Sequence, residues 1–180
     1  MDKKILLEIA KKAISDTLTG NKSLEPDIQE HFIELKEKRA TFVTLNLYGQ
    51  LRGCIGSLTP YRSLFDDIVS NAKAAAFDDP RFMPLNSDEF KHIEIEISLL
   101  TLPQELYYQD INDLKNKIRV GIDGVILTLG GRRATFLPSV WEQLSDFDLF
   151  FVHLCQKAGL DGNCLNHHPK IEIYQAEKIK

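Results

Sequence analysis

Cys54 is the first residue whose surroundings suggest chemistry, because it stands between two glycines in the stretch LRGCIG, residues 51–56. If this stretch is extended, Arg52, Cys54 and Gly56 share one face of the strand. Same-face neighbours lie roughly 7 Å apart, a distance that an arginine side chain spans. Arg52 would then place positive charge beside the thiol and favour its nucleophilic thiolate form. Gly53 and Gly56 would let a ligand approach the backbone closely.

The same stretch has a second interpretation, in which Cys54 only packs. Cysteine is among the residue types most often buried, and a reactive thiol is the exception. In this case the thiol is a small core residue in a bulged strand. Both interpretations stay open at the level of the sequence.

The loop FDDPRF, residues 77–82, is a second candidate. Asp78 and Asp79 follow a predicted helix, and the helix dipole disfavours anions at that end. Functional sites are enriched in such broken local rules. Arg81 can compensate by pairing with one aspartate, so the loop is either part of a site or a structural arginine–carboxylate clamp.

The polar face of residues 92–101 carries a third set. Glu94, Glu96 and Ser98 alternate there with isoleucines and leucines. The two glutamates can act as acid and base if the face is covered, and are solvated if it is open. We favour the solvated interpretation for Glu94 and keep Glu96 as a candidate proton acceptor. Arg132 and Arg133 would point to opposite faces of a strand, where one binds an anion or both belong to a surface hairpin.

A metal site is not predicted. Cys164, His167 and His168, with His153 as a fourth ligand, match no standard zinc spacing, and no cofactor motif is present. Cys155 lies on an apolar helix face and is predicted to be core. The odd number of cysteines, three, and the absence of a C-x-x-C motif suggest no disulfide framework, so we expect a reduced, cytoplasmic protein.

Composition limits the remaining choices. The chain of 180 residues is most simply one domain, residues 1–180, with 43% hydrophobic and 27% charged residues. A net charge of −4 argues against broad, charge-driven nucleic-acid binding. The amino-terminal residues are not a signal peptide, and no apolar run approaches the roughly 20 residues of a membrane span.

Hydrophobic periodicity predicts the elements that must position these residues. Helices are expected at 1–18 (ended by Gly20), 26–38, 60–76 (capped by Thr59, with Tyr61 on its buried face) and 146–158 (capped by Gly159). Strands are expected at 41–47, 51–57, 92–101 and 170–177, with two or three more within 117–138 and turns at 48–50, 123–124 and 130–131. This mixture predicts an α+β fold with an antiparallel or mixed sheet and flanking helices.

Several of these stretches together resemble the AMMECR-type domain family, in prokaryotes the protein A component of the AmmeMemoRadiSam system. The blocks are LRGCIGSL, AAAFDDPRF, EIEISLLT, VGIDGVIL, RRATFLPSVWEQ and FFVHLCQKAGL, in the family's order and spacing, from about Ala40 to Tyr174. Carried over by position, the matching residues are Arg52, Gly53, Cys54, Gly56, Asp79, Arg81, Phe82, Glu96, Ser98, Arg133 and Pro138.

The resemblance implies a single α+β domain with a larger and a smaller lobe and a cleft between them. It also implies partners, a Memo-type protein and a radical S-adenosylmethionine protein, a role in RNA or metabolite modification, and a catalytic function for Cys54. The alternative is a module that binds a ligand, RNA or a protein without catalysis. Met83 stands where the family usually has proline, and residues 161–168 have no counterpart in the family pattern.

Overall fold

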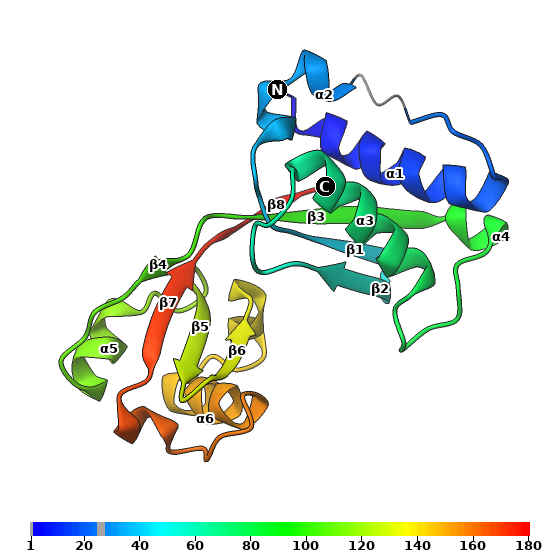
Figure 1. Cartoon of the computed structure of the whole chain (residues 1–180). Helices are drawn as coiled ribbons and strands as arrows, with labels where there is room; N and C mark the ends of the chain where they lie inside the picture. The colour runs from blue at the N-terminus through cyan, green and yellow to red at the C-terminus, as the bar shows by residue number, and fades with distance from the viewer. Residues whose placement is uncertain (1, 25–27) are drawn as a thin grey trace. The chain divides into compact units, whose positions relative to one another are not determined.

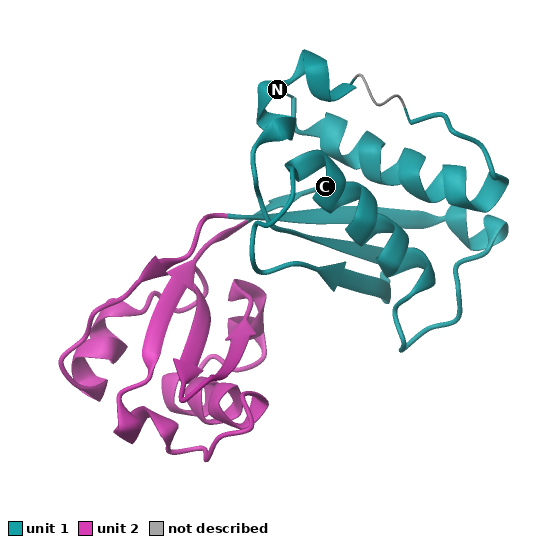
Figure 2. Cartoon of the chain, viewed as in Figure 1, with its two compact units in different colours: residues 1–100, 177–180 teal, residues 101–176 magenta. Residues whose placement is uncertain are grey.

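Two four-stranded sheets organise the chain, with strand orders β2-β1-β3-β8 and β4-β7-β5-β6. The computed structural model describes residues 2–24 and 28–180. Unit 1 comprises residues 1–100 and 177–180, and unit 2 comprises residues 101–176 (Figure 2). The registered strand pairs are antiparallel, and helices accompany each sheet, so the predicted α+β class is confirmed.

In unit 1, α1 and α3 cover one face of the sheet (Figure 1). The alternating residues Val43, Leu45 and Ile97 point into that layer and are completely buried. They pack against apolar faces of both helices, including Leu6 and Ile68. The elements are α1 (Lys4–Thr19), α2 (Ile28–His31), η1 (Ile33–Lys36), β1 (Thr41–Leu47), β2 (Gln50–Gly56), α3 (Leu64–Phe77), α4 (Ser87–Phe90), β3 (Ile93–Leu100) and β8 (Ala176–Ile179).

In unit 2, the sheet packs on α6 and on the aromatic side chains of a second core. Trp141 stacks on Phe150 with ring centroids 3.5 Å apart, and the indole N–H donates to the Asp123 carbonyl. The elements are β4 (Gln104–Glu105), α5 (Ile111–Lys117), β5 (Gly124–Leu129), β6 (Arg132–Phe136), η2 (Pro138–Glu142), α6 (Phe147–Lys157), η3 (Cys164–His167) and β7 (Lys170–Tyr174).

The strongest periodic signals gave the correct elements. The first helix ends at Gly20 in the left-handed conformation, and the β1–β2 hairpin turns at Tyr48 and Gly49, both with positive φ. The strand at 93–100 and the helix at 147–157 are also present as predicted, the latter followed by Gly159.

Two predicted helices are wrong in part. Within the described residues 28–38, the predicted helix is replaced by the short α2 and η1, because Phe32 is extended between them. Its predicted start at Pro26 lies outside the described residues. The helix predicted from Pro60 starts at Leu64, because the Ser63 hydroxyl caps it by accepting the Asp66 N–H. Tyr61 therefore precedes the helix and is exposed.

In unit 2 the local signals misplaced two boundaries. Of the two or three strands predicted within 117–138, β5 and β6 are present, but residues 118–123 before β5 form no strand. Asp123 accepts the backbone N–H and the guanidinium of Arg119 there. The single closing strand predicted at 170–177 is two strands: β7 pairs in the sheet of unit 2, and β8 joins the sheet of unit 1.

The expectation of three reduced cysteines is also wrong. Cys155 and Cys164 form a disulfide, and only Cys54 is free. The two partners are nine residues apart, and the chain reverses between α6 and η3, which brings their Cα atoms to 5.9 Å. None of the helices in the described part of the chain has the length and apolarity needed to cross a membrane.

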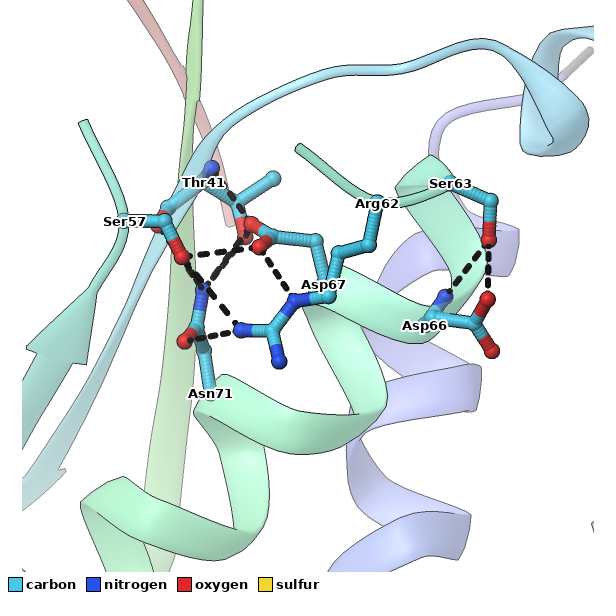
Figure 3. A network of polar contacts seen from close by, with 7 residues as sticks. All are labelled: Thr41, Ser57, Arg62, Ser63, Asp66, Asp67 and Asn71. Carbon is cyan, nitrogen blue, oxygen red and sulfur yellow. Dashed lines mark hydrogen bonds and ion pairs between the residues drawn. The ribbon is translucent and has the colours of Figure 1, made fainter. Parts of the chain in front are cut away.

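A buried carboxylate connects the ends of β1 and β2 to α3 (Figure 3). Asp67 is 1% exposed and accepts five hydrogen bonds, two from Thr41 and one each from Ser57, Arg62 and Asn71. Arg62 and Asn71 also bond to each other, so each side chain of the cluster has more than one hydrogen bond or a bond to the buried carboxylate. Such a network of buried hydrogen bonds fixes the hairpin relative to the helix.

We therefore expect Asp67→Asn to lower the free energy of unfolding by about 2–4 kcal/mol. The substitution removes the buried anion that pairs with Arg62, and one hydroxyl group loses its hydrogen-bond acceptor. Urea unfolding at neutral pH measures this. Asp66→Asn is the matched control: Asp66 is the preceding residue of the same helix and is exposed. Its expected cost is below about 1 kcal/mol. Equal costs for the two variants would contradict the assignment.

Candidate functional site

Cys54 lies on the face of the unit 1 sheet opposite α1 and α3. It pairs with Thr44 of β1, and Thr44 pairs in turn with Glu96 of β3, so the three residues form one row across the strands. The Thr44 hydroxyl donates a hydrogen bond to Cys54 Sγ at 3.3 Å. The thiol is free and half-buried. Cys54 is thus a half-buried residue whose sulfur accepts a hydrogen bond from a neighbouring hydroxyl.

A β-bulge puts Cys54 on this face. The hairpin register runs Leu47 with Gln50 and Asn46 with Leu51, and then shifts so that Leu45 pairs with Gly53. Arg52 is the extra residue. Without the shift Cys54 would oppose Val43, whose side chain is buried on the helix-covered face.

The loop after α3 holds the backbone of Cys54 on its outer edge. Asp79 Oδ2 accepts the Cys54 N–H at 2.9 Å, and the Arg81 guanidinium donates to the Cys54 carbonyl at 3.3 Å. Arg81 also bonds to both carboxylate oxygens of Asp79, at 2.7 and 3.0 Å. Because β2 is an edge strand, these groups would otherwise lack partners within the sheet. The predicted arginine–carboxylate clamp is present, and it forms hydrogen bonds with the backbone of Cys54.

This clamp also places an ion pair against the backbone of Cys54. Hydrogen bonds, first from Arg81 and then from the Cys54 and Arg81 N–H groups, hold the pKa of Asp79 far below its usual range despite the opposing effect of burial. The pKa of Arg81 is raised, mainly by the hydrogen bond to Asp79 and to a smaller extent by the charges of Asp79 and Cys54. Asp79 is 4% exposed, whereas half of the Arg81 side chain is exposed. The pair stays ionised and presents its cationic end to solvent.

Arg52 does not have the partner that strict strand alternation predicts. Its guanidinium forms a two-point ion pair with Glu89, at 2.8 and 2.9 Å, and donates to the Met83 carbonyl. The bulge explains the difference, because it removes Arg52 from the alternation that would align it with Cys54. The cation that contacts Cys54 is therefore Arg81 rather than Arg52.

The two glycines meet the protein's own atoms. A Cβ on Gly53 would lie 2.1 Å from the carbonyl oxygen of Ala75 in α3, and a Cβ on Gly56 would lie 2.2 Å from the Phe42 ring. Neither position tolerates a side chain, so the spacing of the glycines around Cys54 has a packing cause. Their predicted function in binding a ligand remains a prediction.

Glu96, Ser98 and Arg133 have partners of their own, and among the residues that the structure describes no direct contact joins any of them to Cys54. Glu96 is two strands away, roughly 10 Å by strand spacing, and contacts Lys180 at 2.9 Å and Lys178 at 3.9 Å. Ser98 is 9% exposed and opposes Phe42. Arg133 belongs to unit 2, where it pairs with Glu172 at 3.9 Å. Cys54, Asp79 and Arg81 are thus the predicted residues that unit 1 brings into direct contact.

Comparison with known proteins decides the family. A family model described as AMMECR1 matches residues 7–179. The chain belongs to the AMMECR1 family. A protein from Methanothermobacter thermautotrophicus is 38% identical over 173 residues, which cover 94% of this chain and 88% of the relative. Protein MK0488 from Methanopyrus kandleri is 38% identical over 184 residues, covering 96% of this chain and 84% of the relative.

The AMMECR1 fold of this chain also resembles a solved structure. The crystal structure of PH0010 from Pyrococcus horikoshii, described as an uncharacterized protein, matches with a TM-score of 0.84 at 35% identity, covering 97% of this chain and 88% of that one. The family assignment predicted from the ordered sequence blocks is therefore confirmed. It identifies the domain over nearly the whole chain.

Sequence reasoning missed two residues of this AMMECR1 site. The alternating pattern marks Thr44 only as a strand residue, whereas in the structure Thr44 supplies the hydrogen bond to the thiol. Glu89 both caps α4 and neutralises Arg52. The capping pattern, Asn86 followed three residues later by Glu89, was the available signal for a fixed carboxylate at this position.

The ion pair of the clamp predicts a pH-dependent contribution to stability. Because the pKa of Asp79 is lowered by folding, its contribution is fully present above the usual aspartate pKa of about 4 and is lost as the pH falls below it. We expect Asp79→Asn to lower the free energy of unfolding by about 1–3 kcal/mol at pH 7. The difference in this free energy between the variant and the unsubstituted chain should shrink below about pH 4. Urea unfolding between about pH 7 and pH 3 measures both.

Asp78→Asn is the control, since Asp78 is adjacent but exposed and is expected to cost less than about 0.5 kcal/mol. A gap between the Asp79 variant and the unsubstituted chain that persists unchanged at low pH would show that charge is not the cause.

Proposed function

We propose that this AMMECR1-family chain is a thiol-dependent enzyme or enzyme component in which Cys54 is the nucleophile or covalent acceptor. One observation carries the proposal: a free, half-buried thiol accepts a hydroxyl hydrogen bond while an ionised Asp79–Arg81 pair fixes its backbone on both sides. Hydrogen-bond donors and positive charge beside a sulfur favour the thiolate. A fixed backbone holds that sulfur in one orientation.

The arrangement fits an electrophilic substrate that carries an anionic group. Cys54 Sγ would attack the electrophilic carbon, the new S–C bond replacing the bond to a leaving group that departs with its electron pair. The exposed part of the Arg81 guanidinium would orient the anion. Glu96, on the far side of Thr44 in the same row, would accept a proton from the bound substrate.

We also propose that the chain works in the cytoplasm with a Memo-type protein and a radical S-adenosylmethionine protein, in the modification of RNA or a metabolite. Family membership supports these partners. With a net charge of −4, a structured RNA would have to be recognised locally. A salt-sensitive affinity for structured RNA would favour RNA over a metabolite.

A second candidate is a non-catalytic binding module in which Cys54 only packs. The structural roles of Gly53, Gly56 and Arg52 favour it, because each is explained by contacts within the chain. Pull-down of the two proposed partners with the unsubstituted chain and with Cys54→Ser separates the candidates. Undiminished assembly and undiminished biological activity of the variant would support the binding module.

Alkylation tests the thiol directly. Without reductant the disulfide leaves Cys54 as the free cysteine, so iodoacetamide labels one position that mass spectrometry locates. We expect Cys54 to react at least about threefold faster at neutral pH in the folded chain than in a peptide of residues 50–58, which has the same neighbours in sequence but not the clamp. An equal or slower reaction in the folded chain would remove the nucleophile proposal.

Thr44→Val tests the hydroxyl. Valine keeps the shape of threonine but donates no hydrogen bond, so we expect the alkylation rate of Cys54 to fall about two- to fivefold. Thr44→Ser should restore most of the rate, and Thr128→Val in unit 2 is the matched control. A rate unaffected by Thr44→Val would mean that the hydroxyl does not influence the sulfur.

A further inference from the structure

The disulfide of unit 2 joins the end of α6 to the short helix η3. Cys155 lies in the last turns of α6 and Cys164 begins η3. Both are buried in the unit 2 core, with at most 1% of each residue exposed. The ten-residue segment from Gly159 to His168, called the latch segment below, connects α6 to β7 and contains Cys164.

The backbone hydrogen bonds of the latch segment are local. Its N–H groups at residues 160, 164, 166 and 168 donate to carbonyls at residues 155, 161, 163 and 165, so these backbone bonds tie the segment to itself and to the end of α6. One side-chain hydrogen bond comes from β6, where the exposed Arg132 guanidinium donates to the Gly159 carbonyl. Its apolar anchors besides Cys164 are Leu160 and Leu165, which are only half-buried. A segment with so few burial and hydrogen-bond anchors has a low free energy of local opening.

Both ends of the latch segment have left-handed backbone conformations, which can act as hinges. Gly159 has φ 72° and His168 has φ 51°. Glycine adopts this conformation freely, but histidine does so at a cost. His168 is kept there by stacking on Tyr108 at 4.3 Å, and the Tyr108 hydroxyl donates to the Pro169 carbonyl. Opening of the segment would let His168 relax.

We propose that the Cys155–Cys164 disulfide is a redox-operated latch: when formed it holds the latch segment on α6, and when reduced it lets the segment open about its two hinges. The reductant is a dithiol. One of its thiolates attacks a sulfur of the disulfide and forms a mixed disulfide, and its second thiol displaces the cysteine. The dithiol loses two electrons and becomes a disulfide, and the two cysteines gain them and become thiols.

Burial of both sulfurs adds a condition on the rate. A thiolate cannot reach either sulfur in the closed state, so reduction requires a transient partial opening while the disulfide is still formed, and loss of the cross-link then lets the segment open fully. The rate of reduction therefore depends on how often unit 2 opens locally. The proposal for the disulfide does not depend on the reaction proposed for Cys54.

Hydrogen exchange read by mass spectrometry tests the latch in the full chain with Cys54→Ala, which removes the third thiol. The oxidised state is prepared with glutathione disulfide and the reduced state with dithiothreitol. We expect amides of residues 159–168 to exchange at least about tenfold faster after reduction, because a cross-link closing a loop of this size restrains the open state. Amides of β1 and β3 in unit 1 are the internal control and should not change.

A double variant, Cys155→Ala with Cys164→Ala, should exchange fast at residues 159–168 in both buffers. If this variant does not fold, the comparison of the oxidised and reduced chain still decides. Equal exchange of residues 159–168 in the two states would overturn the proposal. So would a count of two free thiols in the Cys54→Ala chain after treatment with glutathione disulfide.

Discussion

The buried carboxylate of Asp67 is the interaction on which the arrangement of unit 1 depends. Its five hydrogen bonds join the first residue of β1, the residue after β2, Arg62 just before α3 and Asn71 within α3. A buried charge is tolerated only when it is paired and fully hydrogen-bonded, so the carboxylate demands all of these partners at once. The hairpin that carries Cys54 is thereby fixed relative to the helix whose end supplies the clamp.

The clamp applies the same logic at the other end of α3. Asp79 follows the helix, where its charge is unfavourable, and Arg81 and the Cys54 N–H compensate. The edge of β2 needs hydrogen-bond partners, and the loop supplies them. The same contacts thus neutralise Asp79 and supply hydrogen-bond partners to the edge of β2. As a result the backbone of Cys54 is held by hydrogen bonds at both its N–H and its carbonyl. This restraint on the backbone is a stronger reason to consider Cys54 for chemistry than the presence of two neighbouring glycines.

Those glycines show how one sequence pattern allowed two explanations. Their positions suggested space for a ligand, but α3 and the Phe42 ring occupy that space. The position of Arg52 likewise suggested a positive charge beside the thiol, but its guanidinium forms an ion pair with Glu89. The AMMECR1 assignment was predictable because ordered blocks of sequence carry it over most of the chain. The partners of individual side chains were not, since they depend on contacts across 25 to 37 residues of sequence.

The sequence by itself determined the family, the α+β class, the hairpin turn at Tyr48 and Gly49, and the strands and helices with the clearest periodicity. These follow from local backbone preferences and from the repeat of apolar residues, which a sequence displays directly. Only the tertiary structure decided the bulge at Arg52, the clamp on Cys54, the division of the last strand between two sheets and the disulfide. The physical reason is that strand register, ion pairing and cysteine pairing are set by which distant segments pack together.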